Sequence, residues 1–191
     1  MSGVPITALH TASLTDATWQ LVETVLKLFA GIVLIRILIP LLQVDRFNPV
    51  SQVIYRLTEP LIHPLRVVLR PLGRFDLAAF VLLLLLHLAA RALLLSLYGL
   101  PLAPFALLAG SLNDVLRMLL GLYLVLIIVA VLLSWFGRGA RHPIVPLIWQ
   151  LTEPVLAPLR RVIPPLAGID FSPLLAVLAL QFLLRLVSPG F

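Results

Sequence analysis

The sequence predicts an all-α integral membrane protein with four transmembrane helices in two tandem repeats, each repeat carrying a bent amphipathic interfacial helical segment between its spans. The chain has 191 residues, of which 61% are apolar and 12% charged, and its mean hydropathy is +1.12. A typical soluble domain is about 25% charged and about 45–50% apolar. Four stretches approach the roughly 20 apolar residues that cross a bilayer. One proline-rich phrase occurs twice, as LTEPLIHPLRVV at 57–68 and LTEPVLAPLRRV at 151–162.

Residues 1–18 are predicted to be an N-terminal tail. They lack the basic start, apolar run and cleavage site of a signal peptide, so we expect no cleaved leader there. The first span is predicted at about 19–42. Glu23 and Lys27 stand four residues apart near its outer end, in the order that favours an ion pair. We expect Arg36 to snorkel toward the inner headgroups.

An amphipathic segment is predicted at 49–72. Thr58 or Glu59 is expected to cap a new helical start with Pro60 in its first turn, and Pro64 is expected to bend the chain. Arginines on the polar face favour a position in the headgroup plane or a shallow dip into the membrane.

The remaining elements follow in order. Asp76 is expected to cap the second span, at about 77–98. Residues 99–112 hold two prolines and are predicted to be an interfacial connection. The third span is predicted at about 115–136, followed by a second amphipathic segment at 143–166. Asp170 is expected to cap the fourth span, at about 171–187, which is short for a full crossing.

The doubled phrase marks an internal repeat. Aligning the chain with itself at an offset of 94 residues makes 11 of 20 positions identical between 57–76 and 151–170. The repeats are therefore assigned to 19–98 and 113–191. Two spans per repeat insert both repeats the same way up, as a parallel repeat. The repeat motif consists of Thr58, Glu59, Pro60, Pro64 and Asp76, matched by Thr152, Glu153, Pro154, Pro158 and Asp170. We expect Glu59 to pair with Arg66 and Glu153 with Arg160, either holding each bend or crossing between the copies.

Charge predicts the orientation. The two loops at 43–76 and 137–170 hold nine arginines. The positive-inside rule places both loops in the cytoplasm and both termini in the periplasm. Anionic lipid headgroups, a membrane-protein partner or a second copy of the chain are the expected partners of these loops. The arginines predicted to make these contacts are Arg56, Arg66, Arg70, Arg160 and Arg161.

Polar residues inside the predicted spans leave two interpretations open. His87 and Arg91 align with Gln181 and Arg185, and each pair lies on one helix face. The two faces could line a central polar seam that binds an ion or ligand. The favoured interpretation is that these side chains snorkel to the headgroups or form structural pairs. The intramembrane polar set is Arg36, His87, Arg91, Gln181 and Arg185.

The doubled phrase resembles the bacterial YggT (YlmG-like) family, together with Phe47, Asn48 and Pro49 before it and GIDFSP at 168–173 after its second copy. The resemblance covers nearly the whole chain as two tandem units. It departs in the first copy, where Arg70 replaces a proline. It implies a bacterial inner-membrane protein linked to osmotic tolerance and envelope organisation, without an established catalytic residue.

No enzyme is predicted. The chain has no cysteine, no nucleophile–base pair and no phosphate-binding glycine loop. In so apolar a chain, the basic residues indicate cytoplasmic membrane edges rather than a nucleic-acid groove. We expect no cofactor, no metal site at His63 or His142, and no nucleic-acid partner. The favoured hypothesis is a non-enzymatic membrane organiser that acts in osmotic-stress tolerance. The alternative is an ion or small-solute conductor in osmotic adaptation.

Overall fold

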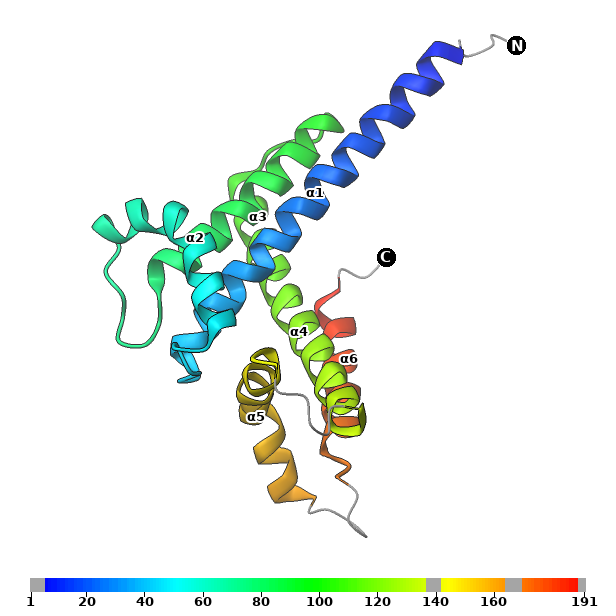
Figure 1. The fold of residues 1–191 in the computed structure, drawn as a ribbon. Coiled ribbons are helices and arrows are strands. Elements are labelled where there is room, and N and C mark those ends of the chain that lie inside the picture. The colour runs from blue at the N-terminus through cyan, green and yellow to red at the C-terminus, as the bar shows by residue number, and fades with distance from the viewer. Residues whose placement is uncertain (1–5, 137–141, 164–169, 189–191) are drawn as a thin grey trace.

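The computed structural model describes residues 6–136, 142–163 and 170–188, with side chains described for 19–135, 142–163 and 170–188. Within these ranges the chain is helical, and α1 and α4 run in one direction while α3 and α6 return (Figure 1). The helices are α1 (Ile6–Leu41), α2 (Pro49–Val68), α3 (Leu77–Leu97), α4 (Pro104–Phe136), α5 (Ile144–Val162) and α6 (Ser172–Val187).

Three of the described helices are long and apolar enough to cross a membrane, over Trp19–Leu41, Leu77–Leu97 and Pro104–Trp135. The fourth candidate, α6, has 16 residues and is apolar. Its length of about 24 Å at about 1.5 Å per residue falls short of a hydrocarbon core of about 30 Å. The crossing by α6 therefore stays a prediction.

Two helices begin earlier than predicted. α1 is helical from Ile6, so most of the predicted tail at 1–18 continues the first span as helix. This stretch contains neither proline nor glycine after Pro5, so nothing in it interrupts the helix. α4 begins at Pro104, so the predicted connection at 99–112 is wrong for its last nine residues. Proline is well placed at a helix start, because its missing N–H would have no partner there.

The doubled phrase lies within a continuous helix in both repeats. Asn48 caps the start of α2, where its side chain accepts a hydrogen bond from the Val50 amide at 2.9 Å. The helix then continues through Pro60 and Pro64. Thr58 lies in the middle of this helix and donates to the Ile54 carbonyl at 2.7 Å. The prediction that Thr58 or Glu59 caps a new helical start is therefore wrong. α5 likewise continues through Pro154 and Pro158.

Each repeat has its own buried cluster of apolar side chains. Val33, Ile62 and Leu83 belong to the cluster that joins α1, α2 and α3. Ile127 and Leu156, which are the counterparts of Val33 and Ile62 at the offset of 94, belong to the cluster that joins α4, α5 and α6. The two repeats are thus folded in the same way around equivalent residues.

A third cluster lies between the repeats. It contains Leu38 and Ile39 of α1, Ile54 of α2, Ala130 of α4 and Leu151 of α5, among others. Hydrogen bonds join the repeats beside it. The Asn48 side chain donates to the Pro143 carbonyl at 2.7 Å, and the Asp45 amide donates to the Gln150 side chain at 2.8 Å. The connection between α2 and α5 is therefore made near their N-terminal ends.

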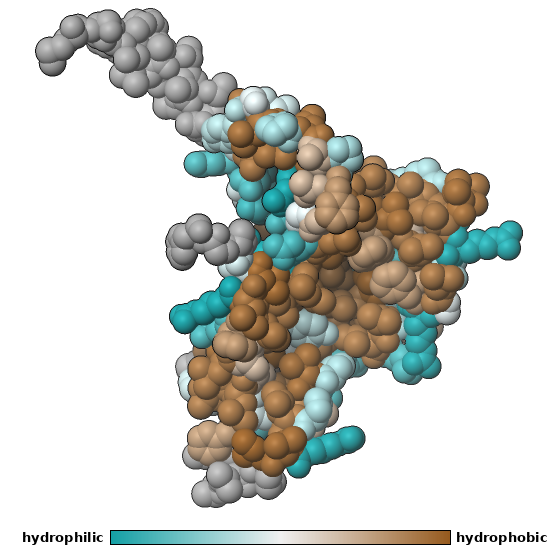
Figure 2. Space-filling model, turned by 180° about the vertical axis from the view of Figure 1, so that it is seen from behind, coloured by the Kyte–Doolittle hydropathy of each residue, from teal (hydrophilic) through white to brown (hydrophobic). Residues whose placement is uncertain are grey.

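The outer surface of the helices is largely apolar. Figure 2 shows brown, apolar side chains over most of the face opposite to the view of Figure 1, with teal polar groups toward its edges. Large apolar side chains such as Val125, Leu174 and Phe182 are more than half exposed on α4 and α6. Such a surface is suited to contact with lipid rather than with water.

Candidate functional site

A cluster of four charged side chains ties the first three helices together. Arg36 of α1 pairs with Glu59 of α2 at 2.5 Å, and its Nε lies 3.8 Å from an Asp76 carboxylate oxygen. Arg66 of α2 bridges the same two acids, at 3.0 Å to Glu59 and 2.7 Å to Asp76. Two arginines and two carboxylates make the cluster neutral overall, so burial leaves no net charge uncompensated.

Arg36 is completely buried, so the prediction that it snorkels to the headgroups is wrong. Its guanidinium donates to the Thr58 hydroxyl at 2.6 Å and to the Tyr55 carbonyl at 3.0 Å. It also lies 4.6 Å from the centre of the Tyr55 ring, within the range of a cation–π contact. The partners on α2 hold the side chain inside the protein and remove the need to reach water.

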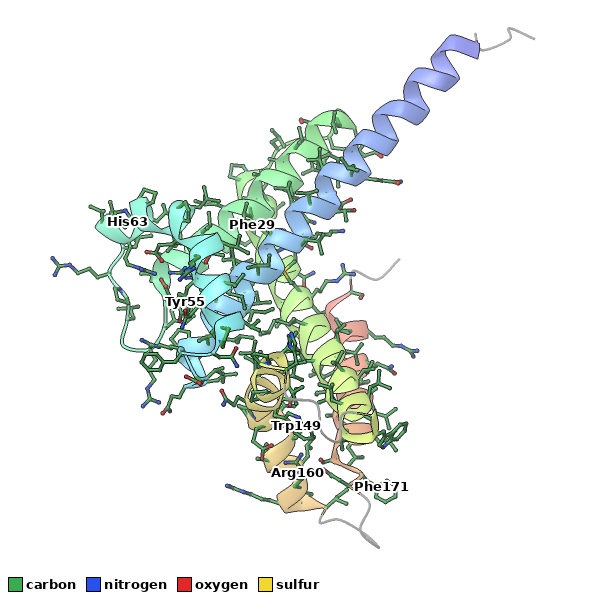
Figure 3. All side chains as sticks on the ribbon, in the orientation of Figure 1. Phe29, Tyr55, His63, Trp149, Arg160 and Phe171 are labelled. Atoms are coloured by element: carbon green, nitrogen blue, oxygen red, sulfur yellow. The ribbon has the colours of Figure 1, made fainter. Side chains whose placement is uncertain are left out.

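The second repeat contains a smaller version of this cluster. Arg160 bridges Glu153 and Asp170, each at 2.8 Å, and it lies near the end of α5 beside the start of α6 (Figure 3). The position of Arg36 is taken by Ala130, so no buried arginine completes the set. The expected pairing of Glu59 with Arg66 and of Glu153 with Arg160 is present, and it lies within each repeat, so neither pair crosses between the copies.

Asp76 is the predicted cap of α3, and Asp170 bonds to the first residue of α6, whose N-cap position is occupied by Phe171. Asp76 precedes α3 and accepts a hydrogen bond from the Ala79 amide at 3.2 Å. Asp170 accepts from the Ser172 amide at 2.9 Å. Partial burial opposes ionisation of Asp170, but hydrogen bonds from Ser172 and Arg160 prevail and hold its pKa below the ordinary value. Each aspartate therefore joins a helix start to an arginine of the preceding helix.

The predicted lipid-contacting arginines divide into two groups. Arg66 and Arg160 are engaged in the internal ion pairs described above. Arg56, Arg70 and Arg161 are exposed and form no ion pair with another described residue. They lie on or directly after α2 and α5, at the end of the molecule where α1 and α4 finish (Figure 1). Only this second group is available to an external partner.

The predicted polar seam is not assembled. Arg91 pairs with Asp114 of α4 at 2.7 Å, and His87 is half-buried beside it on α3. Gln181 and Arg185 are exposed on α6. The alternative in which the two pairs line one polar seam does not fit this packing, because α3 packs against α4 while α6 has no equivalent contact with α1. Structural pairing, the favoured interpretation, holds for Arg91.

Sequence reasoning missed Tyr55 and Asp114. Tyr55 aligns with Trp149, and two aromatic residues at one repeat position were a signal that a ring is required there. Asp114 stands directly before the predicted third span, just as Asp76 and Asp170 stand before theirs. That shared placement was a signal that Asp114 would meet an arginine of a neighbouring helix, as the other two do.

Comparison with known proteins yields a family. The sequence model of the CCB3/YggT family matches the chain twice, over residues 15–97 and 109–191. These limits agree with the two repeats and place each start a few residues before the predicted one. The two matches support the assignment of two tandem units.

Similar proteins occur in several organisms. The chain is 38% identical over 176 residues to an uncharacterised protein of Pseudomonas aeruginosa, covering 91% of this chain and 89% of that one. It is 34% identical over 160 residues to the uncharacterised protein YggT of Escherichia coli K12, covering 84% and 83%. An uncharacterised protein of Guillardia theta, ycf19, is 38% identical over 71 residues, or 36% of this chain and 77% of that protein. No solved structure matches.

Proposed function

Because the chain belongs to the CCB3/YggT family, and three of its helices are long and apolar enough to cross a membrane, we propose that it is a non-enzymatic protein of the bacterial inner membrane. It acts in membrane or envelope organisation and in osmotic-stress tolerance. It does so by binding anionic lipid headgroups or a membrane-protein partner through the cytoplasmic faces of α2 and α5. The relatives are uncharacterised, so the proposal depends on the residues of this chain.

The observation that carries the proposal is the combination of free arginines with an exposed apolar stripe on α2. Val53, Leu57 and Leu61 are each at least half exposed. Arg56 lies three residues after Val53 and therefore beside it on the helix surface. A helix that presents apolar side chains next to arginines is suited to the boundary between headgroups and acyl chains.

The internal ion pairs support this role by fixing the helices in place. Arg66 and Arg160 hold α2 and α5 to the starts of α3 and α6. Arg56 and Arg161 are thereby presented from fixed helices, and Arg70 from the connection that directly follows α2. Each arginine near an anionic membrane surface contributes about 1 kcal/mol of binding free energy.

The experiment compares the lipid dependence of stability in purified full-length protein. Phosphatidylglycerol added to the detergent should raise the unfolding temperature more than phosphatidylcholine does. The triple variant Arg56→Gln, Arg70→Gln and Arg161→Gln should reduce that difference. Arg185→Gln removes an exposed arginine of α6 outside both helices and should leave it unchanged. An equal loss in Arg185→Gln and in each single variant would show general charge attraction and contradict the proposal.

An ion or small-solute conductor is the second candidate, favoured by a charged cavity at the opposite end of the bundle. Against it, the apolar cluster of Val33, Ile37 and Leu83 fills the space between that end and the Arg36 cluster. Purified protein in liposomes, assayed for K⁺ and Na⁺ flux, separates the two candidates. Flux that is abolished by Arg91→Ala would favour conduction.

A further inference from the structure

A cavity of about 550 Å³ opens between α1, α3 and α4, at the end of the bundle away from α2 and α5. Trp19 and Lys27 of α1, His87 and Arg91 of α3, and Arg117 of α4 line it, and α6 contributes Leu184. The cavity therefore belongs to neither repeat alone. It lies where the first repeat meets the first helix of the second.

The charged groups of the cavity leave one positive charge in excess. Glu23 pairs with Lys27 at 2.7 Å, and Asp114 pairs with Arg91 at 2.7 Å. Arg117 forms no ion pair with another described residue. Three cations against two carboxylates give a net charge of +1, so an anion is the complementary ligand.

A histidine supplies an unused polar atom. The Nε2 of His87 is buried and has no hydrogen-bond partner among the described residues. Buried side-chain nitrogens are rarely left in this state unless a ligand or water completes them. In the tautomer that carries hydrogen on Nε2, this atom is a donor suited to a phosphate or carboxylate oxygen.

The position of the Arg91 side chain requires a glycine at position 110 of α4. A methyl group built at Gly110 would collide with the Arg91 guanidinium. Gly110 and Asp114 stand four residues apart, on one face of α4. The Arg91 guanidinium therefore lies against the backbone at Gly110 and pairs with Asp114. Because Asp114 pairs with Arg91, it is not a partner of Arg117.

The remaining wall is apolar. Leu26 and Ala30 of α1, Leu86 of α3 and Met118 of α4 line the cavity beside the charged groups. A free inorganic ion would leave this surface without a contact. An anion attached to a hydrocarbon chain would cover it, because apolar surface removed from water contributes about 25 cal/mol per Å².

We propose that this cavity binds a phosphate group carried on an acyl chain, the chemistry of an anionic phospholipid, with Arg117 and His87 contacting the phosphate and the apolar wall contacting the chain. The repeat offset agrees with a single site per chain. Arg117 aligns with Glu23, which lines the same cavity with the opposite charge. The counterparts of His87 and Arg91 on α6, Gln181 and Arg185, are exposed and lie outside the cavity.

Native mass spectrometry of the full-length protein in a neutral detergent tests the site with lysophosphatidylglycerol as the probe. We expect one tightly bound molecule per chain. Arg117→Gln should weaken its binding about tenfold or more, because a hydrogen bond to a charged group is lost. Ala90→Phe should also weaken it, by filling the cavity without removing a charge. Arg185→Gln is the matched control and should bind as the unchanged protein does.

Three results distinguish the possibilities. Unchanged binding in both Arg117→Gln and Ala90→Phe, in protein that elutes as a single folded species, would overturn the site. Inorganic phosphate that binds as tightly as the lysolipid would assign the site to the free ion and overturn the role of the apolar wall. The variant Arg56→Gln, Arg70→Gln, Arg161→Gln should retain the tight site, so the proposed function can fail without this inference failing.

Discussion

Arg36 and Ala130 occupy equivalent positions in the two repeats, and they show what a buried charge requires. Taking a guanidinium out of water costs several kcal/mol unless hydrogen bonds and opposite charges replace the water. Glu59, Thr58 and the Tyr55 carbonyl provide that replacement for Arg36. In the second repeat an alanine fills the position, and Arg160 serves both acids alone.

This difference predicts that breaking an ion pair has unequal effects on stability in the two repeats. Arg36→Met should lower the free energy of unfolding by about 1–3 kcal/mol, because the Tyr55 carbonyl loses its guanidinium donor and Arg66 alone is left to pair with Glu59 and Asp76. Glu153→Gln, which breaks an exposed pair, should cost no more than about 1 kcal/mol. Denaturant unfolding in a fixed detergent measures both. Equal losses in the two variants would mean that the buried arginine adds nothing to the cluster.

Asp170 predicts a dependence on pH. Its pKa is held below the ordinary value, as hydrogen bonds from Ser172 and Arg160 outweigh partial burial. A carboxylate with a depressed folded pKa stabilises the protein above its unfolded pKa of about 3.9, and that contribution is lost as the pH falls through the folded pKa.

The measurement compares Asp170→Asn with the unchanged protein between pH 7 and pH 3. The unchanged protein should unfold at a higher temperature at neutral pH, and the difference should shrink below about pH 4. A difference that stays constant over this range would show that the ionised carboxylate is not the stabilising form.

α2 and α5 share a sequence phrase and one buried face, which carries Thr58 in α2 and Thr152 in α5, but α5 also buries an adjoining stripe that α2 leaves exposed. Leu57 is 55% exposed, whereas its counterpart Leu151 is 1% exposed and belongs to the cluster between the repeats. Val53 and Leu147 differ in the same way, at 54% and 4%. One helix thus presents apolar side chains outward, while the other contributes them to the core.

A pair of matched substitutions tests this asymmetry. Leu151→Ala should cost about 2–5 kcal/mol, the usual range for a large-to-small change in a packed core. Leu57→Ala removes the same atoms from an exposed position and should stay within about 0.5 kcal/mol. Thermal unfolding in one detergent gives both values. A symmetric packing of α2 and α5 would instead make the two losses equal.

At the scale of the whole molecule, the directions of the helices place both arginine-bearing segments at one end. α1 and α4 both lead into that end and α3 and α6 leave it, as expected for a parallel repeat (Figure 1). The cavity lined by Arg91 and Arg117 lies at the other end. The two ends therefore offer different chemistry, an exposed arginine surface and a partly open, anion-complementary cavity.

Single cysteines test whether α6 crosses the membrane, since the native chain contains none. Ser188→Cys follows α6, and His63→Cys lies exposed on α2 (Figure 3). A maleimide that cannot cross membranes should label Ser188→Cys in intact spheroplasts, and it should label His63→Cys only after the cells are opened. Labelling of neither cysteine before lysis and of both after it would place α6 at the inner surface instead.

The sequence by itself determined much of this protein. The excess of apolar residues required helices that close their own hydrogen bonds in lipid, and the offset of 94 identified two units folded around equivalent residues. The spacing of Glu59 to Arg66 and of Glu153 to Arg160 indicated pairs that the structure contains. These features depend on composition and on the spacing of residues along the chain, and both can be determined from the sequence alone.

Only the tertiary structure decided which equivalent residues remain equivalent. Two like repeats on one chain are joined by a single connection, so α3 packs against α4 and no second connection imposes the same contact on α1 and α6. That difference gives Arg91 the partner Asp114 while Arg185 stays exposed. Leu151 is buried in the cluster formed with α1, α2 and α4, whereas its counterpart Leu57 stays exposed. The tertiary structure also places Arg36 inside the protein, because its hydrogen-bond partners lie on another helix, 19 to 23 residues further along the chain. Helical periodicity relates residues three or four positions apart, so it does not predict contacts at this separation.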